Sequence, residues 1–303
     1  IKMNTKESVH GSLLVMKELL QQGGMFMHNH YQEACEIVYR LRDNGDKTIR
    51  QTVVVLIPQL ANYSPNDFAQ TYLHKFMMHL SSMLKSDIER NDAFLAIGNI
   101  ANAVKSAISP YLENILGYVR AGLSPKSRSR GSVEPVFECI SRLAAAVGQT
   151  LSKYMESLLD PIFACELSEK LTQALVDMAH HITPVAPIIQ ERLLNMLSNI
   201  LCGEPFRPMG APTSNSISSI PKAQRDQKDP EAYVKHQKEI KLALNALGSF
   251  DFDGHVLNEF VRDVAIKYVE DDNPEIRAAA ALTCCQLYVK DPIVAQTSVH
   301  AIQ

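Results

Sequence analysis

The sequence predicts an all-α protein built as a solenoid, a chain of helical hairpins stacked one on another. Apolar residues recur with helical spacing along most of the chain, and one apolar pattern returns about every 40 residues. Gly and Pro stand between the periodic segments more often than inside them, and no stretch favours a strand over a helix. A single hairpin leaves apolar faces uncovered, so such units are expected to be stable only when stacked on neighbours.

The repeated pattern is an apolar quartet at positions i, i+3, i+4 and i+7 of a predicted first helix. The i+3 residue is usually small and the i+4 and i+7 residues are usually large, which lets neighbouring helices approach closely. The clear copies are Val53/Leu56/Ile57/Leu60, Ala93/Ala96/Ile97/Ile100, Val136/Cys139/Ile140/Leu143, Leu171/Ala174/Leu175/Met178 and Ile240/Ala243/Leu244/Leu247. Two poorer copies flank them, Ser12/Val15/Met16/Leu19 and Ala280/Thr283/Cys284/Leu287.

A turn and a second amphipathic helix follow the quartets, so each unit is predicted to be a hairpin. In the turns, a residue suited to capping a helix precedes Pro at the first helical position. These pairs are Ser64-Pro65, Ser109-Pro110, Thr183-Pro184 and Asp291-Pro292, while Thr150 and Asp253 take the cap role without Pro. Pro58 lies inside a first helix and is expected to kink it, and Gly248 is interpreted as a helix terminator.

The predicted organisation is one continuous solenoid in two blocks, residues 1–202 and 237–303, separated by residues 203–236. That segment is rich in Pro, Ser and polar residues, so we expect a disordered loop. Its serines make it a candidate for phosphorylation, although unstructured Ser-rich loops are common without it: Ser214, Ser216, Ser218 and Ser219. The cations of residues 125–132 favour a solvated turn over an anion site: Lys126, Arg128 and Arg130.

The composition describes a globular protein with no polyanionic partner. The chain is 46% hydrophobic and 21% charged with a net charge of -3, so a nucleic-acid partner is not expected. No apolar run approaches the roughly 20 residues that cross a bilayer, so no direct membrane insertion is expected. The chain begins with Ile1 rather than Met and is interpreted as an internal fragment. Its scattered cysteines, without a C-x-x-C pair, favour reduced, buried thiols in a cytosolic or nuclear compartment.

The sequence offers no catalytic, cofactor-binding or metal-binding residue. Asp251 and the residues after it suggest a calcium loop, but Val256 and Arg262 occupy places that need Gly and Glu, so we interpret the stretch as a turn. A zinc set of His28, His30 and Cys35 lacks a fourth ligand at a usual spacing. The remaining histidines are placed on the solvated edge of a helix or at a helix end: His74, His79, His180 and His181. No nucleophile motif or phosphate loop is present.

Four stretches carry a family resemblance: VHGSLLVMKELL at 9–20, TVVVLIPQLANYSPNDF at 52–68, ERNDAFLAIGNIANAV at 89–104, and ALNALGSFDFDGHVLNEFVRDVA at 243–265 continuing into NPEIRAAAALTCCQL. Through them the chain resembles HEAT-repeat proteins, and more narrowly the amino-terminal HEAT region of the target of rapamycin (TOR) kinases. LGSFDFDGH is the most specific stretch, because a generic repeat does not require those residues at a turn. The resemblance implies a HEAT-repeat α-solenoid with a right-handed superhelix.

The resemblance also implies a function, that of a non-catalytic scaffold segment of a large serine/threonine kinase of the phosphatidylinositol-kinase-related class. Its implied partners are a second TOR protomer and a Raptor-type accessory subunit, in the cytoplasm with peripheral association with the lysosomal or vacuolar membrane. The glycine-rich, H-R-D and D-F-G motifs of a kinase domain are missing from these residues, and no cofactor is expected. The loops predicted at 21–30 and 203–236 differ in length between family members, so contacts made by them are not carried over.

Two other functions remain open from the sequence. A nuclear transport receptor shares the repeat period and the charge, although no acidic run occurs in a loop between helices here. A helical hydrolase is the enzymatic alternative, and it has no candidate catalytic residue.

Overall fold

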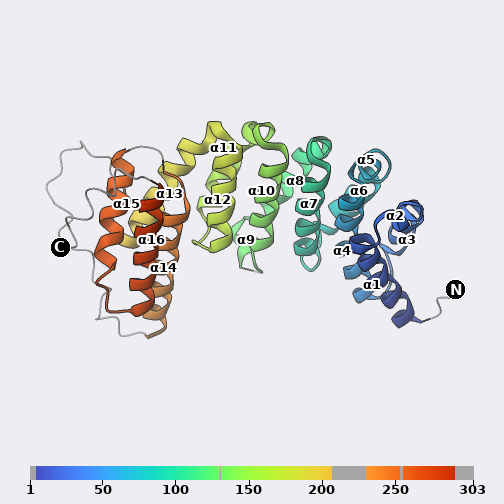
Figure 1. The fold of residues 1–303 in the computed structure, drawn as a ribbon, viewed down its shortest axis with the longest axis horizontal. Helices are drawn as coiled ribbons and strands as arrows, with labels where there is room; N and C mark the ends of the chain where they lie inside the picture. Colours follow the sequence, from blue (N-terminus) through green and yellow to red (C-terminus); the bar gives the residue numbers. More distant parts are fainter. Residues whose placement is uncertain (1–4, 130, 207–229, 253–254, 291–303) are drawn as a thin grey trace. The chain divides into compact units, whose positions relative to one another are not determined.

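The fold is all-α, as the sequence predicts (Figure 1). The computed structural model describes residues 5–129, 131–206, 230–252 and 255–290, and these contain helices and turns but no strand. The first helices of the hairpins are α1 (Lys6–Gln22), α4 (Lys47–Tyr63), α7 (Arg90–Val104), α10 (Glu134–Val147), α12 (Glu169–His181), α14 (Pro230–Ser249) and α16 (Pro274–Lys290). The second helices are α3 (Tyr31–Leu41), α6 (Leu73–Met83), α8 (Leu112–Gly122), α11 (Ser152–Phe163), α13 (Ala186–Cys202) and α15 (His255–Tyr268).

Short elements connect these helices. They are α2 (Gly24–His28), α5 (Pro65–Asp67), a π-helical turn at Phe68–Tyr72, α9 (Pro125–Arg128), and 3₁₀ turns at Lys105–Tyr111, Gly148–Leu151 and Thr183–Val185. The chain divides into two compact units, one of residues 1–162 with 180–184 and one of residues 163–179 with 185–303.

First helices stack directly on one another within the first unit. Helix α4 packs against both α1 and α7, and α7 packs in turn against α10 (Figure 1). The quartets of α4, α7 and α10 are buried, with every member at most 3% exposed. The close approach that small residues permit is visible at Gly98, where a Cβ atom would lie 3.2 Å from the Cα of Cys139. The predicted repeat register is therefore confirmed along this stack.

The second unit repeats this packing. Helix α14 packs against α13 and α16, and α15 also packs against α16. The quartets that end at Met178 and Leu247 are at most 2% exposed. In the stretch LGSFDFDGH, Phe250 and Phe252 are buried with ring centroids 4.8 Å apart, while Asp251 points to solvent. The most specific part of the resemblance is thus an aromatic pair that joins α14 to the core.

The predicted register is wrong in the first repeat. Val15 is 59% exposed, and the other members of its quartet are only partly covered. The buried residues of α1 are Leu13 and Leu20, one position later along the helix than the predicted set. Because α1 packs on α4 through this neighbouring face, the predicted quartet is left lining an open groove.

Several turn predictions also need correction. Pro65 occupies the first turn of α5 as predicted, but the Ser64 hydroxyl donates to the Asp67 carboxylate at 2.6 Å instead of capping the helix. Three other predicted caps lie inside the 3₁₀ turns that precede α8, α11 and α13, because the chain tightens there before it enters the α-helix: Ser109-Pro110, Thr150 and Thr183-Pro184. Asp253 and Asp291-Pro292 lie outside the described residues.

Helix boundaries differ from prediction at three places. Gly248 does not end α14, which runs to Ser249; a Cβ there would lie 3.3 Å from the Cα of Thr283, so the glycine serves close packing against α16. Residues 21–30 are mostly helical rather than a loop, because α1 continues to Gln22 and α2 follows. Helix α14 begins at Pro230 instead of 237, while 207–229, with the four candidate serines, lie outside the described residues. Pro58 is inside α4, as predicted, and is buried.

Candidate interaction surface

The residues considered for metal binding do not form a metal site. Cys35 is fully buried, and burial raises the pKa of its thiol to about 12. The His30 ring packs against Phe26, with centroids 5.1 Å apart, and its Nδ1 lies 3.8 Å from a carboxylate oxygen of Glu33. Among the described residues there is no group of three His, Cys, Asp or Glu side chains placed to hold a metal ion.

The other histidines fall into two groups. His74 is exposed on α6 with its Nδ1 3.2 Å from the Tyr111 hydroxyl, and His180 and His181 end α12 as predicted. His79 differs, because its side chain is only 9% exposed, so its predicted place on a solvated edge is wrong. The turn between α3 and α4 faces the edge of α6 on which His79 lies, with the Asp43 carboxylate 3.8 Å from the His79 Nδ1.

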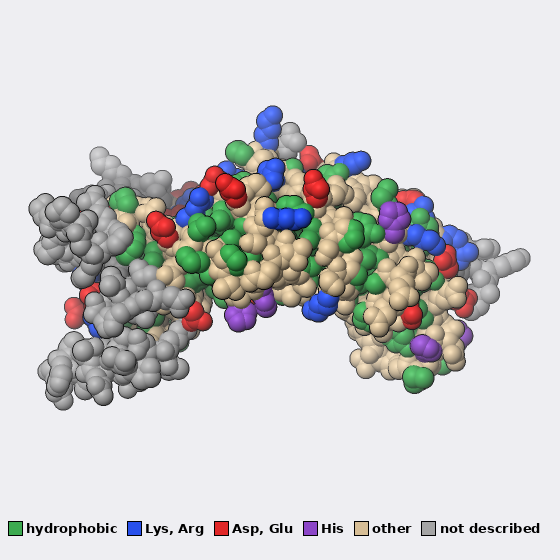
Figure 2. Space-filling model, turned by 90° about the horizontal axis from the view of Figure 1, so that it is seen from above, with side chains coloured by type: hydrophobic (Ala, Val, Ile, Leu, Met, Phe, Trp, Pro, Cys, Tyr) green, Lys and Arg blue, Asp and Glu red, His purple; other side chains and the backbone are tan. Residues whose placement is uncertain are grey.

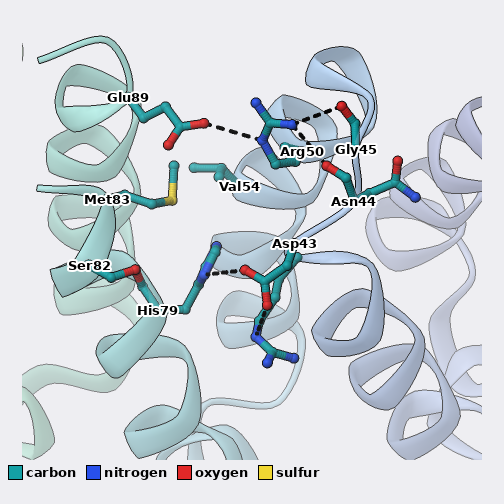
Figure 3. A pocket seen from close by; sticks show the side chains of 10 residues that line it. Asp43, Asn44, Gly45, Arg50, Val54, His79, Ser82, Met83 and Glu89 are labelled. Atoms are coloured by element: carbon teal, nitrogen blue, oxygen red, sulfur yellow. Dashed lines mark hydrogen bonds and ion pairs between the residues drawn. The ribbon is translucent and has the colours of Figure 1, made fainter. Parts of the chain in front are cut away.

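This turn and α6 enclose a pocket of about 390 Å³ (Figure 3). We call it the turn pocket. Residues of the α3–α4 turn and of α4 form one wall, and α6 with the segment before α7 forms the other. The lining residues are Arg42, Asp43, Asn44, Gly45, Arg50, Val54, His79, Ser82, Met83 and Glu89.

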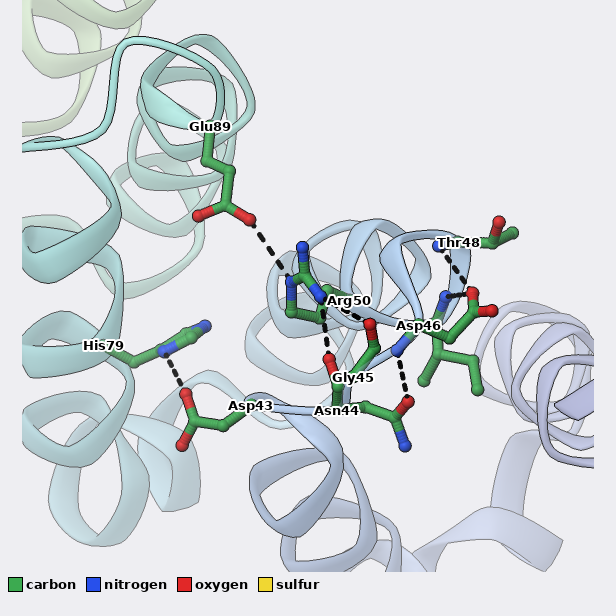
Figure 4. Close-up of polar contacts among 9 residues, drawn as sticks. Asp43, Asn44, Gly45, Asp46, Thr48, Arg50, His79 and Glu89 are labelled. Carbon is green, nitrogen blue, oxygen red and sulfur yellow. Dashed lines mark hydrogen bonds and ion pairs between the residues drawn. The ribbon is translucent and has the colours of Figure 1, made fainter.

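A network of hydrogen bonds fixes the α3–α4 turn at the start of α4 (Figure 4). The Asp46 carboxylate caps α4 by accepting from the backbone N–H groups of Thr48 at 2.8 Å and Ile49 at 3.3 Å. The hydrogen bond from the Ile49 N–H is the largest cause that holds the pKa of Asp46 below its usual value. The Asn44 side-chain oxygen accepts from the Asp46 N–H at 2.9 Å. The sequence Asn44-Gly45-Asp46 therefore forms a turn with defined capping contacts.

Arg50 ties this turn to the next repeat. Its Nη1 donates to the carbonyls of Asn44 at 2.8 Å and Gly45 at 3.2 Å. Its Nε donates to the Glu89 carboxylate at 3.3 Å, just before α7. One guanidinium thus bridges two neighbouring hairpins and holds the mouth of the turn pocket in place.

His79 is the unusual group of the turn pocket. Its Nδ1 faces the Asp43 carboxylate at 3.8 Å, and its Nε2 is buried with no hydrogen-bond partner among the described residues. Burial lowers the pKa of this imidazole, and the nearby positive charge of Arg42 acts in the same direction, although Asp43 and Glu89 act against it. These surroundings therefore favour the neutral form of the ring.

The predicted cation turn at residues 125–132 is only partly solvated. Lys126 is exposed, but Arg128 is half-buried in α9, and Arg130 lies outside the described residues. Figure 2 shows acidic and basic side chains interspersed on the viewed face, without a large area of one sign. Within the described part of the chain, no helix is both long and apolar enough to cross a bilayer.

Another hollow among the described residues is an apolar groove. It has a volume of about 310 Å³, and its walls come from α1, α2 and α3. Phe26 stands at its edge with 61% of its surface exposed. The groove is lined by Ser12, Val15, Met16, Leu19, Phe26, Met27, His30, Glu33, Ala34 and Ile37.

Comparison with known proteins places these features in a family. The family model "Importin subunit beta-1-like, TPR repeats" matches residues 17–198, more than half of the chain. The chain belongs to this importin-β-1-like repeat family. Among solved structures, this chain is similar to importin β, with a TM-score of 0.60 and 14% identity. The match covers 93% of this chain and 33% of importin β. This chain is also similar to Kap121p bound to Ste12p, with a TM-score of 0.58 and 15% identity over 95% of this chain and 30% of that one. These likenesses show the solenoid fold.

The relatives of this chain by sequence include TOR kinases. It is 45% identical, over its whole length, to serine/threonine-protein kinase tor1 of Schizosaccharomyces pombe. It is 32% identical to TOR2 of Saccharomyces cerevisiae over 100% of the chain, and to TOR of Arabidopsis thaliana over 92%. The predicted resemblance to the amino-terminal HEAT region of the TOR kinases is confirmed. The chain spans only 13%, 13% and 11% of these three relatives.

Proposed function

We propose that this chain is a non-catalytic scaffold segment of a TOR kinase, which supports dimerisation and holds accessory subunits such as Raptor in nutrient and growth signalling. The observation that carries the proposal is the 45% identity to tor1 along the whole chain. The buried first-helix quartets support the same reading, because they are needed for the hairpins to stack. Stacked hairpins also present long rows of exposed side chains, which suit the binding of other proteins.

A competition experiment tests the proposal. Raptor is captured with the full-length TOR protein that contains this segment, and the isolated 303-residue chain is added in increasing excess. We expect the chain to displace Raptor and to lower the dimer fraction measured by mass photometry. The negative control is the Leu247→Asp variant, which is expected to unfold the second unit and to compete less well. If neither the isolated chain nor a longer solenoid competes for Raptor, the accessory-subunit role is contradicted.

A nuclear transport receptor is the second candidate, because the matched family model is that of importin β-1-like proteins. The two functions predict different partners. Binding of the chain to the small GTPase Ran in its GTP-bound form, with no displacement of Raptor, would favour the transport function over the TOR scaffold. We expect no Ran binding at concentrations at which Raptor competition is complete.

A further inference from the structure

We propose that the turn pocket binds a lysine or arginine side chain of a partner protein. The inference rests on the proposed scaffold function and specifies the chemistry of one contact that the scaffold makes. It begins from His79, whose side chain is nine-tenths buried and whose Nε2 has no partner among the described residues. Most buried polar atoms in folded proteins have a hydrogen-bond partner, and this one lines a pocket that a ligand group could enter.

The surroundings of His79 decide which kind of group would satisfy it. Its Nδ1 faces the Asp43 carboxylate at 3.8 Å, so the ring proton of the neutral imidazole is favoured on Nδ1. Nε2 then carries a lone pair and accepts hydrogen bonds. Figure 3 shows the ring extending between the α3–α4 turn and Met83, into the region that the turn pocket encloses. The group that pairs with Nε2 must therefore be a donor.

The charged walls favour the same ligand. Arg42 is already bound, through Nε to Asp43 at 3.0 Å and through Nη1 to the Tyr39 carbonyl at 2.8 Å. Arg50 is likewise bound to two turn carbonyls and to Glu89. The carboxylates of Asp43 and Glu89 can still accept hydrogen bonds, because each has two oxygens with several lone-pair sites. The Asp43 side chain is also 68% exposed. A cationic side chain supplies the donors for these oxygens, whereas an anion would meet two carboxylates and the two guanidiniums that already pair with them.

The apolar part of the lining fits the stem of such a side chain. Val54 and Met83 line the turn pocket beside the polar groups, and lysine and arginine bury their methylene chains along apolar surface. Methionine has three rotatable side-chain bonds, so a rotamer change of Met83 would open the enclosed Nε2 to the incoming donor. The turn itself is held by the Arg50 bridge, so the carboxylates are already positioned before binding.

Photo-crosslinking of the full-length TOR protein tests this inference. The probe is the peptide Ac-Gly-Gly-Arg-Gly-Bpa-NH₂, where Bpa is benzoylphenylalanine, and its counterpart with Lys in place of Arg is tested in parallel. Matched peptides carry Glu or phosphoserine at the same position. Crosslinked sites are mapped by mass spectrometry, and an excess of unlabelled Arg peptide is used as competitor. We expect competable crosslinks at the α3–α4 turn and α6 with the basic peptides and not with the acidic ones.

Variants assign the binding to named groups. Asp43→Asn removes an exposed charge, and we expect it to reduce pocket crosslinking about tenfold, the loss of one hydrogen bond to a charged group. His79→Phe removes the lone pair within a ring of similar size and should also reduce crosslinking severalfold. His74→Phe, on the exposed side of the same helix, is the matched control and should leave it unchanged. Circular dichroism of each variant checks that the fold is intact.

The outcomes separate this inference from the function on which it rests. Equal crosslinking by the Glu or phosphoserine peptide would overturn the choice of a basic ligand, and unchanged crosslinking in folded Asp43→Asn would overturn the site. Raptor recovery is measured in the same preparations. Normal Raptor recovery without selective crosslinking of the basic peptides contradicts only the turn-pocket inference. Failure of the isolated wild-type chain to displace Raptor contradicts the scaffold function.

Discussion

A charge placed at Leu247 should unfold the second unit. Leu247 is fully buried in α14, which packs against α16. Truncating a buried leucine to alanine costs about 2–5 kcal/mol. An aspartate there loses the same apolar burial and adds several kcal/mol for desolvating its carboxyl group. The total approaches the whole stability of a typical domain, about 5–15 kcal/mol.

Urea unfolding followed by far-UV circular dichroism measures this effect. We expect Leu247→Ala to lower the urea midpoint by about 1–2 M, because a loss of about 3 kcal/mol is divided by a slope of about 2 kcal/mol/M. Leu247→Asp should lose helical signal without urea, and hydrogen exchange should locate the loss in α14 and α16. Leu282→Asp is the control, since Leu282 is 55% exposed on α16. Melting of Leu247→Asp like this control would refute the register on which the fold argument depends.

Three further predictions follow from buried contacts. Thr283→Val should cost about 1 kcal/mol, because the hydroxyl donates at 2.8 Å to a carbonyl of α14; an unchanged urea midpoint would contradict a role for this bond. Gly98→Ala should lower the thermal midpoint, since its Cβ would crowd α10, whereas Gly117→Ala, with nothing within 4 Å, should raise it by the equivalent of about 0.5–1 kcal/mol. Burial lowers the pKa of His79, so the unfolded chain takes up this proton at a higher pH, near 6.5, than the folded chain does. The free energy of unfolding should therefore fall as pH decreases below about 6.5, and more in wild type than in His79→Phe; equal pH slopes would contradict this.

The repeat could be predicted from sequence because it depends on local periodicity. Quartets such as Ala93/Ala96/Ile97/Ile100 put small and large residues on one helical face, and that face is buried in α4, α7 and α10, where first helices pack on one another. Helix starts were harder to predict. Pro110 and Pro184 fit the first turn of a helix in type, yet both lie in 3₁₀ turns, which Pro also allows because its φ angle suits either helix.

The turn pocket could not be predicted in the same way. His79 lies at the edge of the apolar stripe of α6, where a helical pattern predicts contact with solvent. What covers it is the α3–α4 turn, which belongs to the preceding hairpin and is distant in sequence. The signals that existed were Asn44-Gly45-Asp46, typical of a tight turn, and Arg50 one helical turn later. Neither signal says which neighbouring helix the turn will face.

Periodicity indicates which face of a helix is apolar, and tertiary packing decides whether that face is buried. The quartet of α4 is fully buried because α1 and α7 lie on either side of it. The corresponding residues of α1 have similar spacing, yet Val15 stays exposed and its neighbours line the apolar groove. The difference is one of register, since α1 buries Leu13 and Leu20, one position later along the helix, where it packs on α4. In a stacked architecture, then, the free energy of a repeat belongs largely to its interfaces, and a substitution at one sequence position has a cost that depends on its place in the stack.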